Sequence, residues 1–287
     1  MGLCAMLQVL YRVCDKLGWN EGRSFPLEPL FQKKDAFRAA WSIILRNMPD
    51  FSKAHGFNFL EESWDYAIVL DACRFDVFQQ VNTLAGDLEK KQSIGSMTTD
   101  WARYALTKQY PDIVLVTANP FLSTTYLKRK PFFKNISAWE IGWDDELLVT
   151  PPWAMLDLSK KTVKRFPEKR IIFWFMQPHH PFIHSHLDFG WNMRDMMIGG
   201  RRGLKSVWTA VKYGELTVEQ VWEAYKNNLK LTMPYVEQLV DYLKGTIVVT
   251  SDHGNCFGEM GLFCHPQGTR IPPLVDVPLL TIKKKPK

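Results

Sequence analysis

Short apolar runs that alternate with helical stretches most restrict what this 287-residue chain can fold into. The runs are apolar on both sides of each expected strand, and they span 66–71, 113–118, 170–176, 246–251 and 277–282. Stretches with helical periodicity lie between them, at 75–84, 99–109, 152–166 and 217–243. Strands of this kind, separated by helices, form parallel or mixed sheets that are covered on both faces. We therefore predict an α/β fold with a mostly parallel or mixed central sheet sandwiched by helices.

The N-terminal part of the chain lacks these strand signals. Residues 1–60 predict a helical extension, and residues 61–287 predict the α/β domain. Apolar residues recur at helical spacing near the start, at Leu3, Leu7, Leu10, Cys14 and Leu17. This spacing predicts an amphipathic helix. Two interpretations stay open: the helix packs on its own domain, or it makes a peripheral contact with a membrane surface.

Composition narrows the class of protein. The net charge is +6, and much of it lies in short clusters of Lys and Arg. Such clusters are typical of a solvated surface or of attraction to anionic substrates. Basic and aromatic residues do not interleave as they do in single-strand binders, so we expect no nucleic-acid partner. Five cysteines without a CxxC pair predict reduced thiols. The sequence has no run of 18 consecutive apolar residues, so we predict no transmembrane helix. Charged residues interrupt the stretch 1–19, so we do not expect it to be a signal peptide. The expected location is therefore cytoplasmic, with peripheral membrane contact as the alternative.

Two of the expected strands end in residues that can bind a metal. Asp71 closes the run 66–71, and Asp252 and His253 follow the run that begins at 246. Active sites of open α/β sheets lie at the carboxyl ends of the strands, and carboxylate with imidazole suits Zn²⁺ or Mn²⁺. Asp71 has an equally simple alternative as the cap of the following helix. Arg74, three residues on, can reach an anionic group beside Asp71.

Hydroxyl residues open the second expected helix. Two small residues, Gly95 and Ser96, lead to Thr98 and Thr99. A threonine at this place is typical of an N-cap. The same position presents a hydroxyl and free backbone N–H groups to an anion. A metal in contact with the hydroxyl would make it a nucleophile at neutral pH.

Histidines gather after the strand 170–176. Four of the seven histidines lie within eight positions: His179, His180, His184 and His186. Such density favours metal binding over core packing. His265 follows the Asp-His pair by twelve positions and adds a further imidazole. Cys256 and Cys264 flank this region as soft ligands or as small apolar packing residues.

The ordered motifs resemble a known family. They are LDACRFD, GSMTTDW, MQPHHPF, TSDHGNCFGE, and CHPQG with VPLL. Together they resemble the alkaline phosphatase superfamily, most closely its sulfatase-like branch and the short sulfatase-like proteins of prokaryotes. The resemblance implies a two-metal site at the edge of the sheet. By position, one metal would be held by Asp71, Asp252, His253 and the nucleophile hydroxyl. The second would be held by His265 and His179, or His180 in its place.

Two departures from the family pattern shape the functional hypothesis. Met97 stands where sulfatases carry the Cys or Ser that becomes formylglycine, so a formylglycine sulfatase is not expected. Phosphodiesterase and phosphoglycerol-transferase branches use threonine, which favours Thr98 as nucleophile and Thr99 as the reserve. The aspartate that usually comes four residues before the second-site histidine is also missing. Phe175 or Met176 stands there, so the second site is weak, uses Gln177, or holds no metal.

The resulting hypothesis is a metal-dependent hydrolase or transferase of phosphoesters, or of sulfoesters, with an anionic ester as its partner. Thr98 would attack, and Arg74 would stabilise charge on the non-bridging oxygens. Zn²⁺ is the expected cofactor, with Mn²⁺, Ca²⁺ and Mg²⁺ as alternatives. Two other functions stay open: a catalytically degenerate scaffold on this fold, and a transferase of phospho head groups at a membrane surface.

Overall fold

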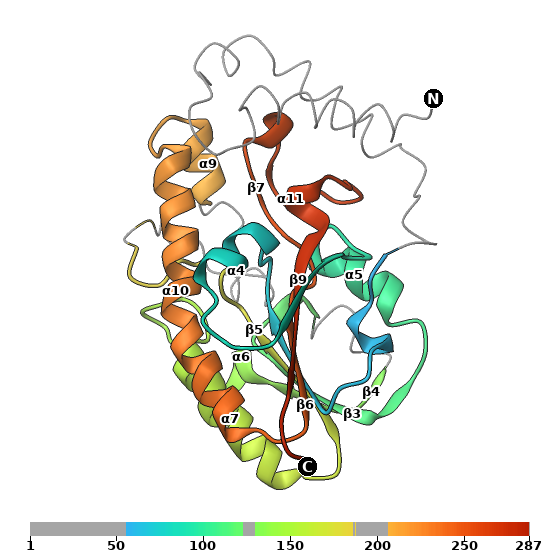
Figure 1. Ribbon diagram of the computed structural model, residues 1–287. Helices are drawn as coiled ribbons and strands as arrows, with labels where there is room; N and C mark the ends of the chain where they lie inside the picture. Colours follow the sequence, from blue (N-terminus) through green and yellow to red (C-terminus); the bar gives the residue numbers. More distant parts are fainter. Residues whose placement is uncertain (1–55, 123–129, 186, 188–205, 287) are drawn as a thin grey trace, which may run out of the picture.

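The computed structural model describes residues 56–122, 130–185, 187 and 206–286. Its centre is a seven-stranded mixed sheet with strand order β2-β9-β6-β1-β5-β3-β4 (Figure 1). The strands are β1 (Tyr66–Leu70), β2 (Asp87–Gln92), β3 (Tyr110–Thr117), β4 (Phe132–Ser137), β5 (Arg170–Phe175), β6 (Thr246–Thr250) and β9 (Asp276–Lys283). The strands β6, β1, β5, β3 and β4 run parallel, whereas β9 is antiparallel to both β6 and β2. The predicted α/β sandwich is therefore confirmed.

The central strands are apolar on both faces because helices cover both. In β1, Tyr66, Ile68 and Leu70 pack into one core cluster, and Ala67 and Val69 pack into the other. The first face is covered by α4 (Phe75–Val81), α7 (Pro152–Arg165) and α10 (Val218–Tyr242). The second is covered by α5 (Thr98–Ala105) and the short helix η2 (Phe59–Glu61). This two-sided burial explains why the strand signals were so plain in the sequence.

The remaining elements lie mostly along the carboxyl edge of the sheet. They are α6 (Ala138–Ile141), α9 (Val207–Lys212), the hairpin β7 (Cys256–Phe257) and β8 (Phe263–Cys264), the short helix η5 (Glu259–Gly261) and α11 (Pro272–Val275). Thr217 caps α10 through a capping box with Gln220, so the helix begins at Val218, one residue after the predicted start. Five predicted strands and four predicted helices are present, with shifted ends. The edge strands β2 and β4 were missed because exposed residues interrupt their apolar pattern. These are mainly charged residues in β2, and Phe133 and Lys134 in β4.

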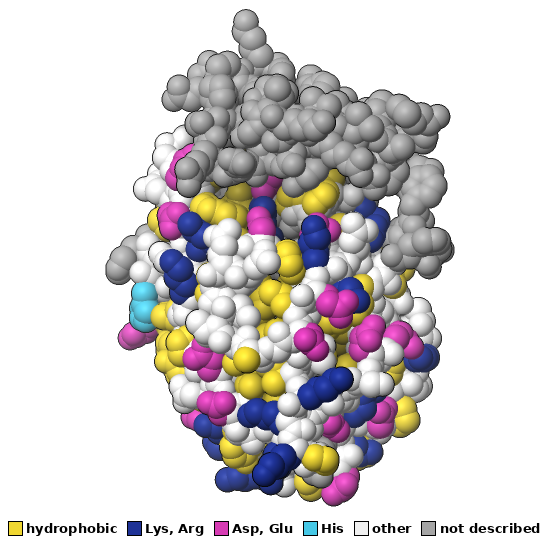
Figure 2. Space-filling model, in the orientation of Figure 1, with side chains coloured by type: hydrophobic (Ala, Val, Ile, Leu, Met, Phe, Trp, Pro, Cys, Tyr) yellow, Lys and Arg dark blue, Asp and Glu magenta, His cyan; other side chains and the backbone are white. Residues whose placement is uncertain are grey.

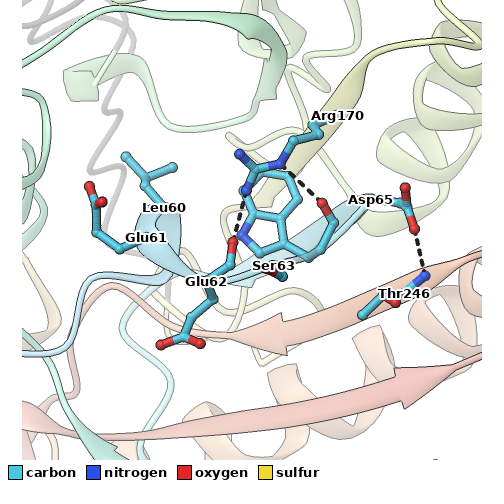
Figure 3. A pocket seen from close by; sticks show the side chains of 8 residues that line it. Leu60, Glu61, Glu62, Ser63, Asp65, Arg170 and Thr246 are labelled. Atoms are coloured by element: carbon cyan, nitrogen blue, oxygen red, sulfur yellow. Dashed lines mark hydrogen bonds between the residues drawn. The ribbon is translucent and has the colours of Figure 1, made fainter.

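A hollow of about 520 Å³ lies at the opposite edge of the sheet, where β1, β5 and β6 begin (Figure 3). Arg170 crosses its wall, with its guanidinium 3.8 Å from the centre of the Trp64 ring. The same side chain donates to Trp64 O and Glu62 O, each at 3.0 Å. These contacts close the start of the sheet. The hollow is thus at the far end of the strands from Asp71 and Asp252.

Several predictions concern residues outside the described ranges. The amphipathic helix near the start, residues 1–55 of the helical extension, and His186 all lie there. Membrane contact, cytoplasmic location and the division at residue 60 stay predictions. In the described ranges, no helix combines the length and apolarity needed to cross a membrane. Figure 2 shows Lys and Arg interspersed with Asp and Glu on one face, so the positive surplus forms no single patch there.

Candidate active site

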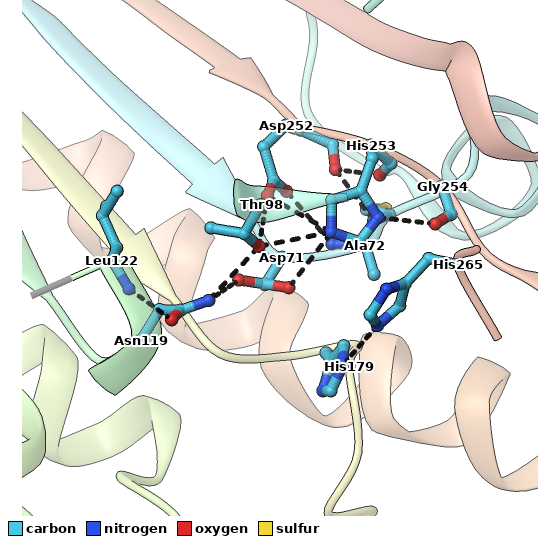
Figure 4. A network of polar contacts seen from close by, with 12 residues as sticks. Asp71, Ala72, Thr98, Asn119, Leu122, His179, Asp252, His253, Gly254 and His265 are labelled. Carbon is cyan, nitrogen blue, oxygen red and sulfur yellow. Dashed lines mark hydrogen bonds and ion pairs between the residues drawn. The ribbon is translucent and has the colours of Figure 1, made fainter. Parts of the chain in front are cut away.

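Four polar side chains from separate parts of the chain meet at the carboxyl edge of the sheet (Figure 4). Asp71 follows β1, Asp252 and His253 follow the adjacent strand β6, and Thr98 is the first residue of α5. All four are buried, and Asp252 and His253 are 0% exposed. One ligand atom from each of Asp71, Asp252 and His253 lies within 4.8 Å of the other two. Parallel neighbours bring their carboxyl ends to one edge, so residues far apart in the sequence become a cluster.

The turn after β6 is held by its own small polar residues. Ser251 Oγ accepts from Cys73 N–H at 2.8 Å and donates to His253 O at 2.6 Å. Gly254 passes so close to the neighbouring chain that a Cβ atom there would lie 2.0 Å from Pro273 O. The glycine of the Asp-His-Gly motif is therefore required by backbone contact, and the contact fixes the position of the two residues before it.

Thr98 is the hydroxyl that enters the cluster. Its Oγ1 donates to Asp252 Oδ2 at 2.8 Å and lies 3.3 Å from His253 Nε2. Thr99 is partly exposed, and its side chain is not among the contacts of the cluster. The N–H groups that open α5 precede its first intrahelical bond, from Trp101 N–H to Met97 O. Thr98, rather than Thr99, therefore combines a hydroxyl, two buried polar neighbours and a helix N-terminus.

The tautomer of His253 is set by its backbone neighbour. Its Nδ1 lies 2.7 Å from Gly254 O, and a carbonyl only accepts, so Nδ1 carries the hydrogen. Burial lowers the pKa of His253 to about 4, so the ring is neutral at pH 7. Its Nε2 lone pair then faces Asp252 Oδ2 at 3.4 Å and Asp71 Oδ1 at 3.9 Å. An imidazole lone pair that faces two carboxylate oxygens is a suitable environment for a cation.

The carboxylates have the same character. Asp71 Oδ1 is buried and has no hydrogen-bond partner in the described part of the chain. Burial and the neighbouring Asp252 raise the pKa of Asp71 to about 7, and burial raises that of Asp252 to about 6. A divalent cation bound between them would compensate for two buried negative charges. The donor set of two carboxylates, one imidazole and one hydroxyl therefore fits such an ion.

Comparison with solved structures identifies the fold. The C-terminal periplasmic domain of phosphoethanolamine transferase EptC from Campylobacter jejuni is 12% identical, with 76% of this chain and 78% of that chain covered and a TM-score of 0.49. Lipooligosaccharide phosphoethanolamine transferase A from Neisseria meningitidis is 11% identical, with 99% and 60% covered and a TM-score of 0.50. A protein in the alkaline phosphatase superfamily from Vibrio parahaemolyticus is 10% identical, with 90% and 71% covered and a TM-score of 0.42. The neisserial structure, with its TM-score of 0.50, shares its overall fold with this chain. No protein-family model and no curated protein matches the sequence.

Beside the first cluster, the fold brings two of the predicted histidines together. His179 Nε2 lies 3.0 Å from His265 Nε2, and the rings of His265 and His253 are 4.8 Å apart between centroids. His179 Nδ1 lies 2.6 Å from His180 O, which assigns its hydrogen to Nδ1. His179 is thus the histidine that contacts His265, whereas His180 stacks on His179 with a ring separation of 4.3 Å.

The charge on this pair resides on His265. Burial disfavours the imidazolium, but Cys264, together with the carboxylates Asp71 and Asp252, raises the pKa of His265 to about 9. The pKa of His179 is lowered well below its usual value, first by burial and then by its two histidine neighbours. His265 therefore donates its Nε2 hydrogen to His179. Of the two cysteines near the site, Cys264 raises the pKa of His265, whereas Cys256 packs in a small apolar cluster.

Arg74 makes its side-chain contacts with residues other than Asp71, Thr98, Asp252 and His253. Its guanidinium pairs with Asp76 at 2.7 Å and with Glu259, and it lies 5.0 Å from the centre of the Trp222 ring. Its remaining hydrogen bond goes to Asn255 O. All these partners belong to α4, α10 and the loop after the Asp-His pair. Arg74 therefore holds that loop, and its contact with the non-bridging oxygens stays a prediction.

Three residues of the site were missed in the sequence. Asn119, two positions past β3, donates to Asp71 Oδ2 at 2.6 Å and lies 3.4 Å from Thr98 Oγ1. Trp174, in β5, donates to the same carboxylate oxygen at 3.0 Å. Asp100 accepts from Gln267 Nε2 and Gly268 N–H, which ties the loop after His265 to α5. The strand-end rule that found Asp71 also applies to Asn119, since it follows a buried strand.

Proposed function

We propose that this chain is a metal-dependent phosphoester transferase or hydrolase with Thr98 as its nucleophile. The observation that carries the proposal is the contact of Thr98 Oγ1 with Asp252 Oδ2 and His253 Nε2 inside a buried group of metal-ligand atoms. Neighbours of the same fold support a phosphoryl group as the substrate centre, because the neisserial structure is by name a phosphoethanolamine transferase. We propose Zn²⁺ as the ion, with Mn²⁺, Ca²⁺ or Mg²⁺ as alternatives.

The residues divide the chemistry in a simple way. A divalent ion held by Asp71, Asp252 and His253 would polarise the phosphoryl group and lower the pKa of the Thr98 hydroxyl. Thr98 donates to Asp252 at 2.8 Å, so this carboxylate lies where it takes the proton as the bond from Oγ1 to phosphorus forms. The N–H groups that open α5 lie beside Thr98 and stabilise negative charge on the phosphoryl oxygens.

Turnover requires that every bond formed on Thr98 is later broken. As Oγ1 bonds to phosphorus, the bond from phosphorus to the leaving oxygen breaks, and that oxygen keeps the electron pair. It takes up a proton, for which the cationic His265 is a donor at this edge of the sheet. Water in hydrolysis, or an alcohol in transfer, then attacks phospho-Thr98. As the bond from phosphorus to Thr98 Oγ1 breaks, Asp252 returns its proton to that oxygen. The proton of the attacking water or alcohol restores the cationic His265.

An aryl phosphodiester assay with matched threonine variants tests this proposal. The protein is stripped with chelator, reloaded separately with Zn²⁺, Mn²⁺, Ca²⁺ or Mg²⁺, and assayed on bis(4-nitrophenyl) phosphate and on 4-nitrophenyl sulfate. We expect turnover of the phosphodiester, a loss of roughly 10³-fold or more in Thr98→Ala, and most of the activity retained in Thr99→Ala. Metal content should be unchanged in both variants.

The controls separate the competing functions. Equal activity of Thr98→Ala and wild type would remove Thr98 from the mechanism. Turnover of the aryl sulfate alone would replace the phosphoester by a sulfoester. Wild-type protein that binds no stoichiometric divalent ion and turns over neither ester would favour a degenerate scaffold instead.

A further inference from the structure

The two oxygens of Asp71 have very different surroundings. Oδ2 accepts two hydrogen bonds, from Asn119 Nδ2 at 2.6 Å and from Trp174 Nε1 at 3.0 Å. Oδ1 is buried, accepts none from the described residues, and lies 3.9 Å from His253 Nε2. Rotation of the carboxylate about its Cβ–Cγ bond away from this orientation would break both hydrogen bonds. The two donors therefore hold the plane of the carboxylate and leave its other oxygen facing the cluster.

Both donors are held in place by the sheet: Trp174 lies within β5, and Asn119 lies just past the end of β3. Trp174 is opposite Val69 of β1 and Thr117 of β3 in the parallel register. Its ring is 0% exposed and packs edge-on against Trp101 at 5.0 Å between centroids. The Trp174 N–H group thus has a fixed direction, set by the register of β5 and by the apolar core.

The amide of Asn119 is also oriented. Its Oδ1 accepts from Leu122 N–H at 3.1 Å, and its own backbone N–H donates to Thr117 Oγ1 at 3.0 Å. With the oxygen occupied by a backbone donor, Nδ2 must be the atom that faces Asp71. Trp174 within β5 and Asn119 just past the end of β3 therefore bring their donors to a single oxygen.

We infer that Trp174 and Asn119 are positioning residues, which hold Asp71 so that it binds the metal through Oδ1 alone. The inference rests on the proposed function, because it needs an ion between Asp71, Asp252 and His253. A ligand carboxylate whose second oxygen is fixed by hydrogen bonds is pre-oriented and loses less freedom when the ion binds. Neither residue touches the ion or the substrate in this role, and neither is required for Thr98 to be the nucleophile.

Zn²⁺ affinity of the chelator-stripped full chain tests the inference without any activity assay. Zn²⁺ is titrated in competition with a chromophoric chelator at pH 7 into wild type, Trp174→Phe, Asn119→Asp and a control. Asn119→Asp keeps an oxygen for Leu122 N–H but replaces the donor to Asp71 with an acceptor. Trp64→Phe is the matched control, because it also removes a buried indole hydrogen bond from the same apolar cluster. That bond goes to Phe59 O at 2.7 Å, not to Asp71.

We expect Trp174→Phe and Asn119→Asp each to bind Zn²⁺ about 10- to 100-fold more weakly than wild type. Trp64→Phe should bind as wild type does, and urea unfolding of the metal-free variants reports whether each one folds. Wild-type affinity in both site variants would overturn the inference and leave the proposed function standing. An equal loss in Trp64→Phe would also overturn it for Trp174, since a loosened core would then explain the effect.

Two further outcomes are decisive. If Trp174→Phe does not fold, Asn119→Asp decides alone, and wild-type affinity in that variant overturns the inference. If wild-type protein itself binds no Zn²⁺, while Mn²⁺, Ca²⁺ and Mg²⁺ in the same assay also fail, the metal site of the proposed function is overturned and the inference falls with it.

Discussion

Replacing Asp71 by asparagine should stabilise the metal-free protein at neutral and alkaline pH. Burial and Asp252 raise the pKa of Asp71 from 3.8 to about 7. The folded protein therefore holds a proton that the unfolded chain has released in the window from about pH 4 to about pH 7. The stability linked to that proton is fully present below about pH 4 and is lost as the pH rises through about 7. The difference between the two pKa values corresponds to as much as about 4 kcal/mol.

The substitution removes this penalty and keeps the hydrogen bonds. The amide oxygen of Asp71→Asn can accept from Asn119 and Trp174 as Oδ2 does, and its NH₂ group then faces the lone pair of His253. Relative to wild type, the variant should therefore gain up to about 4 kcal/mol at pH 8, and the gain should shrink toward zero near pH 4. Titrating groups that do not interact with Asp71 are common to both proteins and cancel in the difference.

Urea unfolding with chelator present measures this difference at pH 5, 6, 7 and 8. A gain that does not change with pH, or a variant less stable than wild type at pH 8, would refute the electrostatic reasoning about Asp71. Addition of Zn²⁺ should reverse the order at pH 8, because only wild type retains the full ligand set and is stabilised by binding.

Three further predictions follow from the same contacts. Zn²⁺ affinity should rise from pH 5 to pH 8, because Asp71 and Asp252 must lose their protons to bind it; a flat profile by competition titration would contradict this. Arg74→Met should cost roughly 3–5 kcal/mol in urea unfolding at pH 7, since it leaves Glu259 buried without its partner, and a variant of wild-type stability would argue against that ion pair. Gly254→Ala should lower Tm and Zn²⁺ affinity together, because its Cβ atom would lie 2.0 Å from Pro273 O and force the turn to move. We expect a cost of about 1–3 kcal/mol in stability. An unchanged calorimetric Tm would show that this position accommodates a Cβ atom.

The fold was predictable because its central strands are apolar on both faces. β1, β5 and β6 are buried almost throughout, so each appears in the sequence as an uninterrupted apolar run. β2 pairs with β9 only, and its exposed charged residues look like a surface loop. Because β2 lies at the edge of the sheet and is not buried on both faces, it lacks the uninterrupted apolar run that identified the central strands.

The site was predictable where side chains follow strands, and not where contacts depend on packing. Asp71 and Asp252 were found because parallel strands end at one edge. The apolar run 170–176 predicts that Trp174 lies in a buried strand. Nothing in the sequence distinguishes an indole that donates to Asp71 from one that only packs in the core. Arg74 was placed by its three-residue distance from Asp71, but the start of α4 turns it toward Asp76 and Glu259. For both residues, the role depends on which side chain they contact, and position along the chain does not reveal that partner.

Anomalous diffraction from a crystal soaked in Zn²⁺ is the most direct measurement of the central claim, which is that these side chains form a metal site around Thr98. The account predicts a peak at the zinc edge within about 2.0–2.2 Å of Asp71 Oδ1, an Asp252 oxygen and His253 Nε2, and in contact with Thr98 Oγ1. Asp71 Oδ2 should remain on Asn119 and Trp174. A fully soaked crystal with no peak between Asp71, Asp252 and His253, or with its only peak elsewhere, would contradict the account.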